Sequence, residues 1–357
     1  MAPSSCLHMV PSSCQKGPGV WVAVCTVVIL TAQNAFLSNL KLGSTTTTDH
    51  PRNNNVVNSS NIDLEMQNDQ NTTAVWIPDA GAVTSLKRAR RVGKTSNLMA
   101  HWRAIESAKE NPLIVDPFAS RLAGTEYLDR GVKKDGFKID FMAVRTKIFD
   151  SFLEDMVQNE GIEQLVIIGA GQDSRAFRLK GLAKESVRVF ELDFPHVLAD
   201  KRELLLEDPE DPLSLPPTVC ERIEVPVDLA ADNWDNQLVL KGFDPSRRSA
   251  WIIEGVTGYI PEDANKELFQ RILTRSPTGS HALATFIGVG SRMGGGVHKF
   301  QTDEPAEFLQ SLGFDAEMSD ISEFAKKLGR GRGNLRRYMG YFVVSASKPT
   351  SLWQLNK

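Results

Sequence analysis

Acidic residues follow three successive apolar runs of the sequence, at the point where each run ends. The run "RVFELDFP" carries Asp193, "VPVDLAAD" carries Asp228, and "WIIEGVTGY" carries Glu254. If the runs are parallel strands, their carboxyl ends meet at the edge where open α/β sheets bind ligands. Asp193 could then accept both hydroxyls of a ribose, and Asp228 could accept a hydrogen bond from an adenine amino group. The alternative for each residue taken alone is a solvated carboxylate in a turn.

A glycine turn closes the apolar run that precedes these three, in "LVIIGAGQDSRAFRL". Gly169 and Gly171 allow a tight turn and a close approach of the backbone to a ligand. A dinucleotide-binding fingerprint would have a third glycine or an alanine where this chain has Ser174. The turn and the carboxylates therefore indicate a nucleoside pocket without a complete pyrophosphate cradle, although the glycines alone also fit a plain strand-to-helix turn.

Arg145 is a further candidate, because it lies on the apolar face of a predicted helix. It stands four residues from both Phe141 and Phe149 in "IDFMAVRTKIFDSFLEDMV". A buried guanidinium needs an anionic partner. That partner could be Asp150 or Asp173 of the protein, or the carboxylate of a ligand.

Strands and helices alternate along the region that must position these residues. Apolar periodicity and helix-start signals predict helices over residues 95–110, 139–157, 262–273 and 304–314. Short apolar runs predict strands at Gln164–Ile168, Val187–Leu192, Arg222–Val227, Ala250–Ile253, Ala282–Phe286 and Tyr341–Ala346. This alternation predicts a mostly parallel sheet that is covered by helices on both faces.

The composition is that of an ordinary globular protein and excludes one class of partner. The net charge of −3 over 357 residues argues against a nucleic-acid-binding protein, which normally has a basic surface. Apart from three cysteines in the first 25 residues, the chain has only Cys220, so its globular part cannot form an internal disulfide.

The N-terminal residues differ from the rest of the chain. Residues 17–40 carry no charge, and Val20–Leu30 is almost wholly apolar. Residues 1–43 are therefore predicted to hold a signal peptide or a membrane anchor, with membrane association through residues 19–37. A cytoplasmic protein with an apolar tail of no consequence is the alternative. The polar residues 44–83 are predicted to form a disordered linker, and the globular domain is predicted to span residues 84–357.

Two groups of residues receive no specific role from their pattern. The histidines, His298 among them, are interpreted as structural or surface residues because no partner is evident in the sequence. The basic stretch "KKLGRGRGNLRR" could attract an acidic molecule, but a solvated loop is the simpler interpretation.

Four segments together resemble the leucine carboxyl methyltransferase family: "NPLIVDPFASRLAG", "RTKIFDSFL", "IIGAGQDSRAFRL" and "FELDFPHVLADK". The resemblance runs from about Thr95 to Lys348 and is closer to the bacterial-type branch of the family. It implies an α/β fold, the class I methyltransferase (Rossmann-like) doubly wound sheet, mostly parallel with one antiparallel strand. Tyr341–Ala346 is the candidate for the antiparallel strand.

The resemblance also implies S-adenosyl-L-methionine as the cofactor and assigns residues to it. The backbone at Gly169 and Gly171 would lie along the methionine portion of the cofactor. Asp193 would hold the ribose, and Asp228 with Leu229 would hold the adenine end. Arg145 would bind the methionine carboxylate, which the basic position Arg103 would also serve. Glu254 would lie near the cofactor amino group or the methyl acceptor. No metal is implied.

The expected activity is therefore that of an S-adenosylmethionine-dependent methyltransferase. A carboxylate acceptor needs no base, whereas a hydroxyl acceptor would need one, and the histidines give little help in choosing between them. An oxygen acceptor is expected, in a carboxylate or hydroxyl group of a small molecule or peptide. Two alternatives are a nicotinamide-dependent oxidoreductase of similar fold and an inactive module that binds S-adenosylmethionine.

Overall fold

The computed structural model describes residues 95–125, 136–208, 210–211, 213–230, 233–291, 298–331 and 340–349. The apolar segment and the polar linker predicted for residues 1–83 lie outside these ranges. None of the helices within them is both long and apolar enough to cross a membrane.

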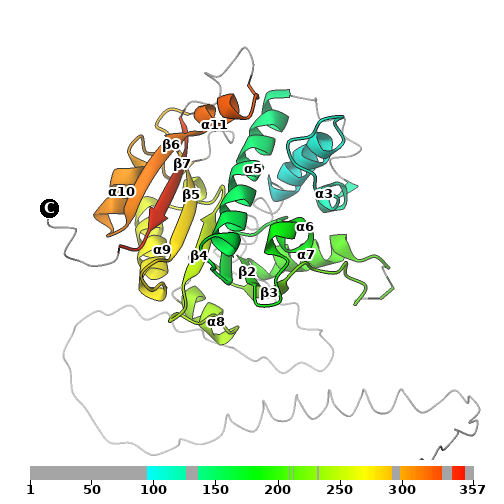
Figure 1. Cartoon of the computed structure of the whole chain (residues 1–357), viewed down its shortest axis with the longest axis horizontal. Helices are drawn as coiled ribbons and strands as arrows, with labels where there is room; N and C mark the ends of the chain where they lie inside the picture. Colours follow the sequence, from blue (N-terminus) through cyan, green and yellow to red (C-terminus); the bar gives the residue numbers. More distant parts are fainter. Residues whose placement is uncertain are drawn as a thin grey trace, which may run out of the picture. The chain divides into compact units, whose positions relative to one another are not determined.

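A seven-stranded sheet forms the centre of the described part of the chain (Figure 1). Its strands are β1 (Gln164–Ile168), β2 (Arg188–Asp193), β3 (Glu221–Pro226), β4 (Ser249–Ile253), β5 (His281–Ile287), β6 (Asp315–Asp320) and β7 (Tyr341–Ser347). They lie in the order β3-β2-β1-β4-β5-β7-β6. β1 to β5 pair in parallel, and β7 is antiparallel to both β5 and β6.

Helices cover both faces of this sheet. They are α3 (Ala119–Ala123), α5 (Gly136–Gln158), α6 (Arg175–Arg178), α7 (Pro195–Leu205), α8 (Trp234–Leu240), α9 (Glu262–Arg275), α10 (Pro305–Ser311) and α11 (Ile321–Lys327). Two short 3₁₀ turns, η1 (Lys180–Leu182) and η2 (Thr257–Tyr259), and a helix at residues 95–107 complete the described elements.

The two faces of the sheet form separate apolar cores. Leu165 and Ile167 of β1 pack with α5, α6 and α11, whereas Val166 and Ile168 pack on the other face with α8, α9 and α10. This alternation follows from the period of two along a strand. It also explains why β1 is apolar throughout, since a central parallel strand is buried on both faces.

The six predicted strands are confirmed, each within one residue at either end. The antiparallel strand is the predicted one, and the fold class is confirmed. The sequence analysis missed β6, whose residues "DAEMSD" are mostly polar. It also missed α3, α6, α7, α8 and α11. The helices predicted over 95–110 and 304–314 each run three residues too far, because they end at residues 107 and 311.

The topology places a crevice at one edge of the sheet. β1 and β4 are neighbours, although the chain leaves β1 toward β2 on one side and leaves β4 toward β5 on the other. Beyond the carboxyl ends of such a pair the connections diverge, and open α/β sheets bind ligands there.

Candidate active site

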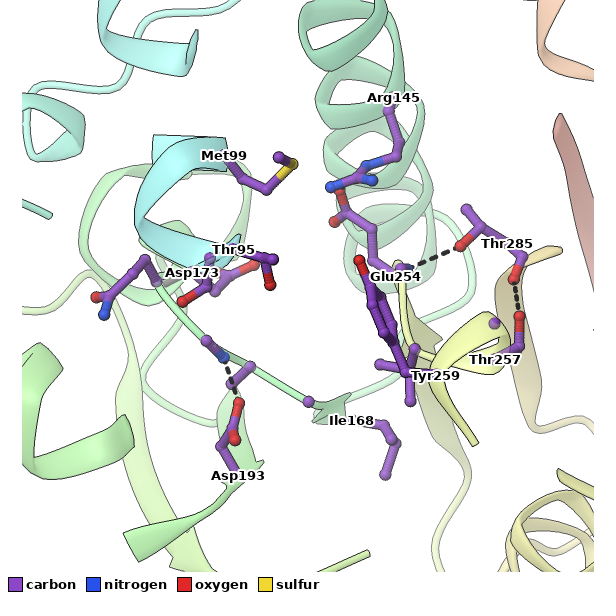
Figure 2. Close-up of a pocket in the computed structure, with 18 of the residues that line it drawn as sticks. Thr95, Met99, Arg145, Ile168, Asp173, Asp193, Glu254, Thr257, Tyr259 and Thr285 are labelled. Atoms are coloured by element: carbon purple, nitrogen blue, oxygen red, sulfur yellow. Dashed lines mark hydrogen bonds and ion pairs between the residues drawn. The ribbon is translucent and has the colours of Figure 1, made fainter. Parts of the chain in front are cut away.

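A cavity of about 960 Å³ lies beyond the carboxyl ends of the parallel strands. Figure 2 shows the helix that carries Thr95 and Met99 on one side of it, with Arg145, Glu254 and Tyr259 facing them from the other. The cavity brings together all the predicted site residues: Arg103, Arg145, Gly169, Gly171, Asp193, Asp228, Leu229 and Glu254.

The glycine turn after β1 has no room for side chains. Gly169 and Gly171 have φ angles of 66° and 46°, which only glycine adopts readily. A Cβ atom on Gly169 would lie 2.6 Å from a methyl carbon of Val256, and one on Gly171 would lie 2.8 Å from the Cβ of Ser96. Both clashes would occur in the cavity wall, so the glycines fix how closely the elements of the site approach one another.

Asp193 joins the end of β2 to this turn. Its Oδ2 accepts the backbone N–H of Gly171 at 2.7 Å (Figure 2), and its Oδ1 accepts the N–H of Phe194 at 2.7 Å. Asp193 forms no ion pair with any described residue. Burial raises the pKa of its carboxyl, and the two N–H bonds offset only part of this rise. The site therefore holds a buried carboxylate that lacks a direct cationic partner.

Asp228 and Leu229 follow β3 at the outer side of the cavity. Asp228 is exposed, and its Oδ1 accepts the N–H of Ala230 at 2.9 Å. Leu229 is half-buried and supplies an apolar surface next to it. This end of the cavity is thus more open than the end at β1.

Arg145 has a protein partner, and it is neither of the two carboxylates considered from the sequence. Its Nε donates to Oε1 of Glu254 at 2.7 Å, and its Nη1 donates to the hydroxyl of Tyr341 at 3.2 Å. Asp150 and Asp173 instead bind Arg175, and Asp150 also binds Arg178. The reason is topological, since α5 passes over the end of β4 and faces Glu254 there.

Opposing effects act on the pKa values of this pair. Burial alone would lower the pKa of Arg145, but Tyr341 and Glu254 outweigh it and leave the pKa above its ordinary value. Burial would raise the pKa of Glu254, but Arg175 and Arg145 leave it below its ordinary value. Both groups are therefore charged at neutral pH.

Arg175 is the principal residue that the sequence analysis missed. It is 3% exposed, and it donates to Oδ1 of Asp150 at 2.7 Å, to Asp173, and to Oε2 of Glu254 at 2.9 Å. Arg178, one turn further along, binds Asp150 through both of its terminal nitrogens at 2.8 and 2.9 Å. A signal was present, because both arginines belong to the motif "DSRAFRL" that carried the family resemblance.

Arg103 closes this network on the other side of the glycine turn. Its Nε donates to Asp116 at 2.8 Å, and its Nη2 donates to the carbonyl of Gln172 at 2.6 Å. Ion pairs thus connect eight residues, all of which except Asp116 and Asp150 line the cavity. They run in order through Arg103, Asp116, Arg178, Asp150, Arg175, Glu254 and Arg145, and Asp173 branches from Arg175. The formal positive and negative charges of this network cancel.

Gln172 follows the glycine turn and also belongs to the cavity wall. The residue is 3% exposed, and its side-chain oxygen is buried without a hydrogen-bond partner among the described residues. Because this oxygen is shielded from the cavity, the part of Gln172 with a clear role is its backbone carbonyl, which accepts from Arg103.

His298 and Tyr259 also line the cavity, although the histidines were interpreted as structural or surface residues. Their rings lie 6.2 Å apart. A Cβ atom on Gly258 would come within 2.9 Å of Nδ1 of His298, so the glycine makes room for the imidazole. His298 is therefore a wall residue of the candidate site.

Comparisons with known proteins match this chain to one family. The sequence model of the family described as "Leucine carboxyl methyltransferase" matches residues 96–273. Two Mycobacteroides abscessus proteins assigned as S-adenosyl-L-methionine-dependent methyltransferases are 37% and 32% identical to the chain. These matches cover 65% and 67% of this chain and 77% and 88% of the relatives, respectively.

A relative from Mycobacterium sp. (strain KMS), assigned in the same way, is 39% identical over 51% of this chain and 62% of its own length. Among solved structures, a DUF574 family protein from Streptomyces avermitilis superposes with a TM-score of 0.47 at 16% identity. That match covers 70% of this chain and 97% of the other.

Proposed function

Because this chain belongs to the leucine carboxyl methyltransferase family, we propose that it methylates a carboxylate or hydroxyl oxygen of a small molecule or peptide. The chain is an S-adenosylmethionine-dependent methyltransferase. The observation that carries the proposed site is the buried carboxylate of Asp193 beside the glycine turn. No described feature favours a nicotinamide-dependent oxidoreductase or an inactive binding module.

The chemistry of the cavity fits the nucleoside part of S-adenosylmethionine. A carboxylate offers about four acceptor positions, and described N–H groups use one on each oxygen of Asp193. The carboxylate can therefore accept both ribose hydroxyls without losing its present bonds. Asp228 and Leu229 supply the polar and apolar contacts proposed for adenine at the open end of the cavity.

The charged network suits the amino-acid end of the donor. That end is a zwitterion without net charge, and the formal charges of the network also cancel. In this proposal Arg145 and Arg103 face the donor carboxylate, while Glu254 faces its ammonium group. Arg145 retains donor capacity, because a guanidinium has five N–H groups and its Nη2 meets only the weakly accepting sulfur of Met142 at 3.7 Å.

Bound S-adenosylmethionine supplies a methyl group on a sulfonium, whose transfer forms an oxygen–carbon bond as the sulfur leaves as a neutral thioether. The walls of the cavity have to exclude water and hold the acceptor oxygen about 3–3.5 Å from the reacting carbon. A carboxylate acceptor needs no base, whereas a hydroxyl acceptor needs one. The imidazole of His298, a wall residue of the same cavity, is the base proposed for that proton.

Calorimetry of the full-length protein with S-adenosylhomocysteine tests the proposed site. Asp193→Ala should weaken binding by about 1.5–3 kcal/mol, because hydrogen bonds to a charged group are lost. Asp315→Ala is the matched control, since that exposed aspartate lies on β6, outside the cavity. Equal affinity of the Asp193→Ala variant and the wild-type protein would contradict the proposed ribose site.

We also propose that Val20–Leu30 anchors or targets the protein. The support is the sequence alone, namely the absence of charge over residues 17–40 and the apolar run within them.

A further inference from the structure

The cavity of 960 Å³ extends beyond the residues assigned to the donor. Its volume lies at the upper end of the range of about 300–1,000 Å³ that is typical of ligand pockets. The residues assigned to the donor lie in the glycine turn, at the ends of β2, β3 and β4, and at Arg103 and Arg145, and they line only part of the cavity. The helix at residues 95–107, the start of α5, and β7 bound the remainder.

Aromatic rings form the wall of this remainder. Trp102 comes from the helix at residues 95–107, Phe137 and Phe141 come from α5, and Tyr341 comes from β7. The rings of Phe137 and Phe141 are 6.1 Å apart, and those of Phe141 and Tyr341 meet edge to face at 4.8 Å. Tyr259 adds a half-buried ring from η2. We call Trp102, Phe137, Phe141, Tyr259 and Tyr341 the aromatic wall.

Two cationic side chains border the aromatic wall. The guanidinium carbon of Arg145 lies 5.9 Å from the centre of the Phe141 ring, and Glu254 pairs with its charge. Nζ of the exposed Lys138 lies 5.7 Å above the ring of Trp102. A molecule against the wall would thus have rings along its body and the ammonium group of Lys138 near Trp102.

We propose that the aromatic wall binds a methyl acceptor with a planar aromatic body that carries an oxygen acid, such as an aryl carboxylic acid. The proposal rests on the proposed function, since it names the class of acceptor. Flat rings pack against other rings in offset or edge-to-face contacts that add to the stabilisation from their buried area. An extended peptide fits less well, because its backbone N–H and C=O groups would be buried against rings without partners.

The test measures the binding of 2-naphthoate to full-length protein saturated with S-adenosylhomocysteine, which cannot donate a methyl group. Decanoate, an aliphatic acid of similar apolar content, and acetate serve as comparison ligands. We expect 2-naphthoate to bind at least tenfold more tightly than decanoate, and acetate to show no binding. Isothermal titration calorimetry gives the affinities directly.

Variants of the wall separate ring contacts from general apolar contact. Trp102→Leu should weaken 2-naphthoate about tenfold, and Trp102→Phe, which keeps a ring, should weaken it less. Leu229→Ala is the matched control, because Leu229 lines the donor side of the same cavity. It should weaken S-adenosylhomocysteine but leave 2-naphthoate unchanged once the protein is saturated.

The possible failures are distinguishable. Absence of S-adenosylhomocysteine binding would overturn the proposed function itself. Normal S-adenosylhomocysteine binding with decanoate equal to 2-naphthoate would overturn only the aromatic acceptor. That comparison uses the wild-type protein, so it decides the matter even if the Trp102→Leu variant does not fold. Unchanged 2-naphthoate affinity in folded Trp102→Leu would also overturn the proposal.

Discussion

Removing either partner of the Arg145–Glu254 pair should have unequal effects on the stability of the unliganded protein. Glu254 binds two arginines, through Oε1 to Arg145 at 2.7 Å and through Oε2 to Arg175 at 2.9 Å. Arg145→Ala therefore leaves Glu254 with a cationic partner. Glu254→Gln instead leaves Arg145 without a described anionic partner and removes one of the partners of Arg175.

The side chains of the pair are 11% and 14% exposed, so neither charge is well solvated once it is unpaired. Breaking a buried pair and leaving one charge uncompensated costs about 3–5 kcal/mol. We expect a loss of this size for Glu254→Gln and a loss of about 1–3 kcal/mol for Arg145→Ala. At roughly 2–4 °C per kcal/mol for a domain of this size, the melting temperatures of the two variants should differ by about 5 °C.

Thermal melts with and without S-adenosylhomocysteine measure the contribution of Arg145 to stability and its proposed contribution to donor binding. If Arg145 also binds the donor carboxylate, Arg145→Ala should lose most of the ligand-induced rise in melting temperature. Its affinity should fall by about 2–5 kcal/mol. Arg145→Lys should recover only part of this, because an ammonium cannot form the bidentate contact. A loss of stability in Arg145→Ala as large as in Glu254→Gln, with ligand stabilisation intact, would refute the reasoning and make Arg145 purely structural.

Three further predictions can be checked with simple measurements. Gly171→Ala should lower the melting temperature, because the new Cβ would lie 2.8 Å from the Cβ of Ser96 and the backbone φ is 46°. Gly161→Ala is the control, with a φ of 65° and no atom within 4 Å of the new Cβ. It should lower the melting temperature less, because it adds backbone strain without a clash. Because the pKa of Glu254 is lowered by its arginines, its stabilisation is present above its ordinary value of 4.5 and is lost as the pH falls through the lowered pKa. The difference in unfolding free energy between wild type and Glu254→Gln should therefore be largest near neutral pH and should shrink in acid, as denaturant titrations can show. If Val20–Leu30 anchors or targets the chain, full-length protein should be found with membranes or be processed, and a chain starting at Ala80 should be neither; uncleaved full-length protein in the soluble fraction would exclude this role.

The strands predicted well from the sequence are those whose side chains are buried on both faces of the sheet. β1 and β4 are apolar because both of their faces are buried, so their positions can be read from short windows. β6 could not be found in this way. Its polar residues "DAEMSD" pair only with β7, and strand formation there depends on that distant partner rather than on local preference.

Some residues of the candidate site could likewise be predicted from local sequence, whereas one contact between them could not. Asp193, Asp228 and Glu254 could be placed at the cavity from the sequence because each lies at or shortly after the end of a predicted strand, and the topology then brings the strand ends together. The partner of Arg145 could not be predicted, because Glu254 is 109 residues further along the chain and meets it only through the packing of α5 on the sheet. Proximity in the sequence suggested Asp150 as an ion-pair partner of Arg145. In the structure Asp150 instead pairs with Arg175 and Arg178.

The position of β7 in the sheet has a consequence for how the chain folds during synthesis. β7 lies between β5 and β6, and β6 pairs with no other described strand. Until Tyr341–Ser347 has left the ribosome, β5 keeps an unpaired edge and β6 has no partner. Unpaired edges can template pairing with other chains, and such intermediates are prone to aggregation. The nascent chain should therefore depend on chaperones until this late strand is inserted, whereas the core around β1 and β4 can form earlier.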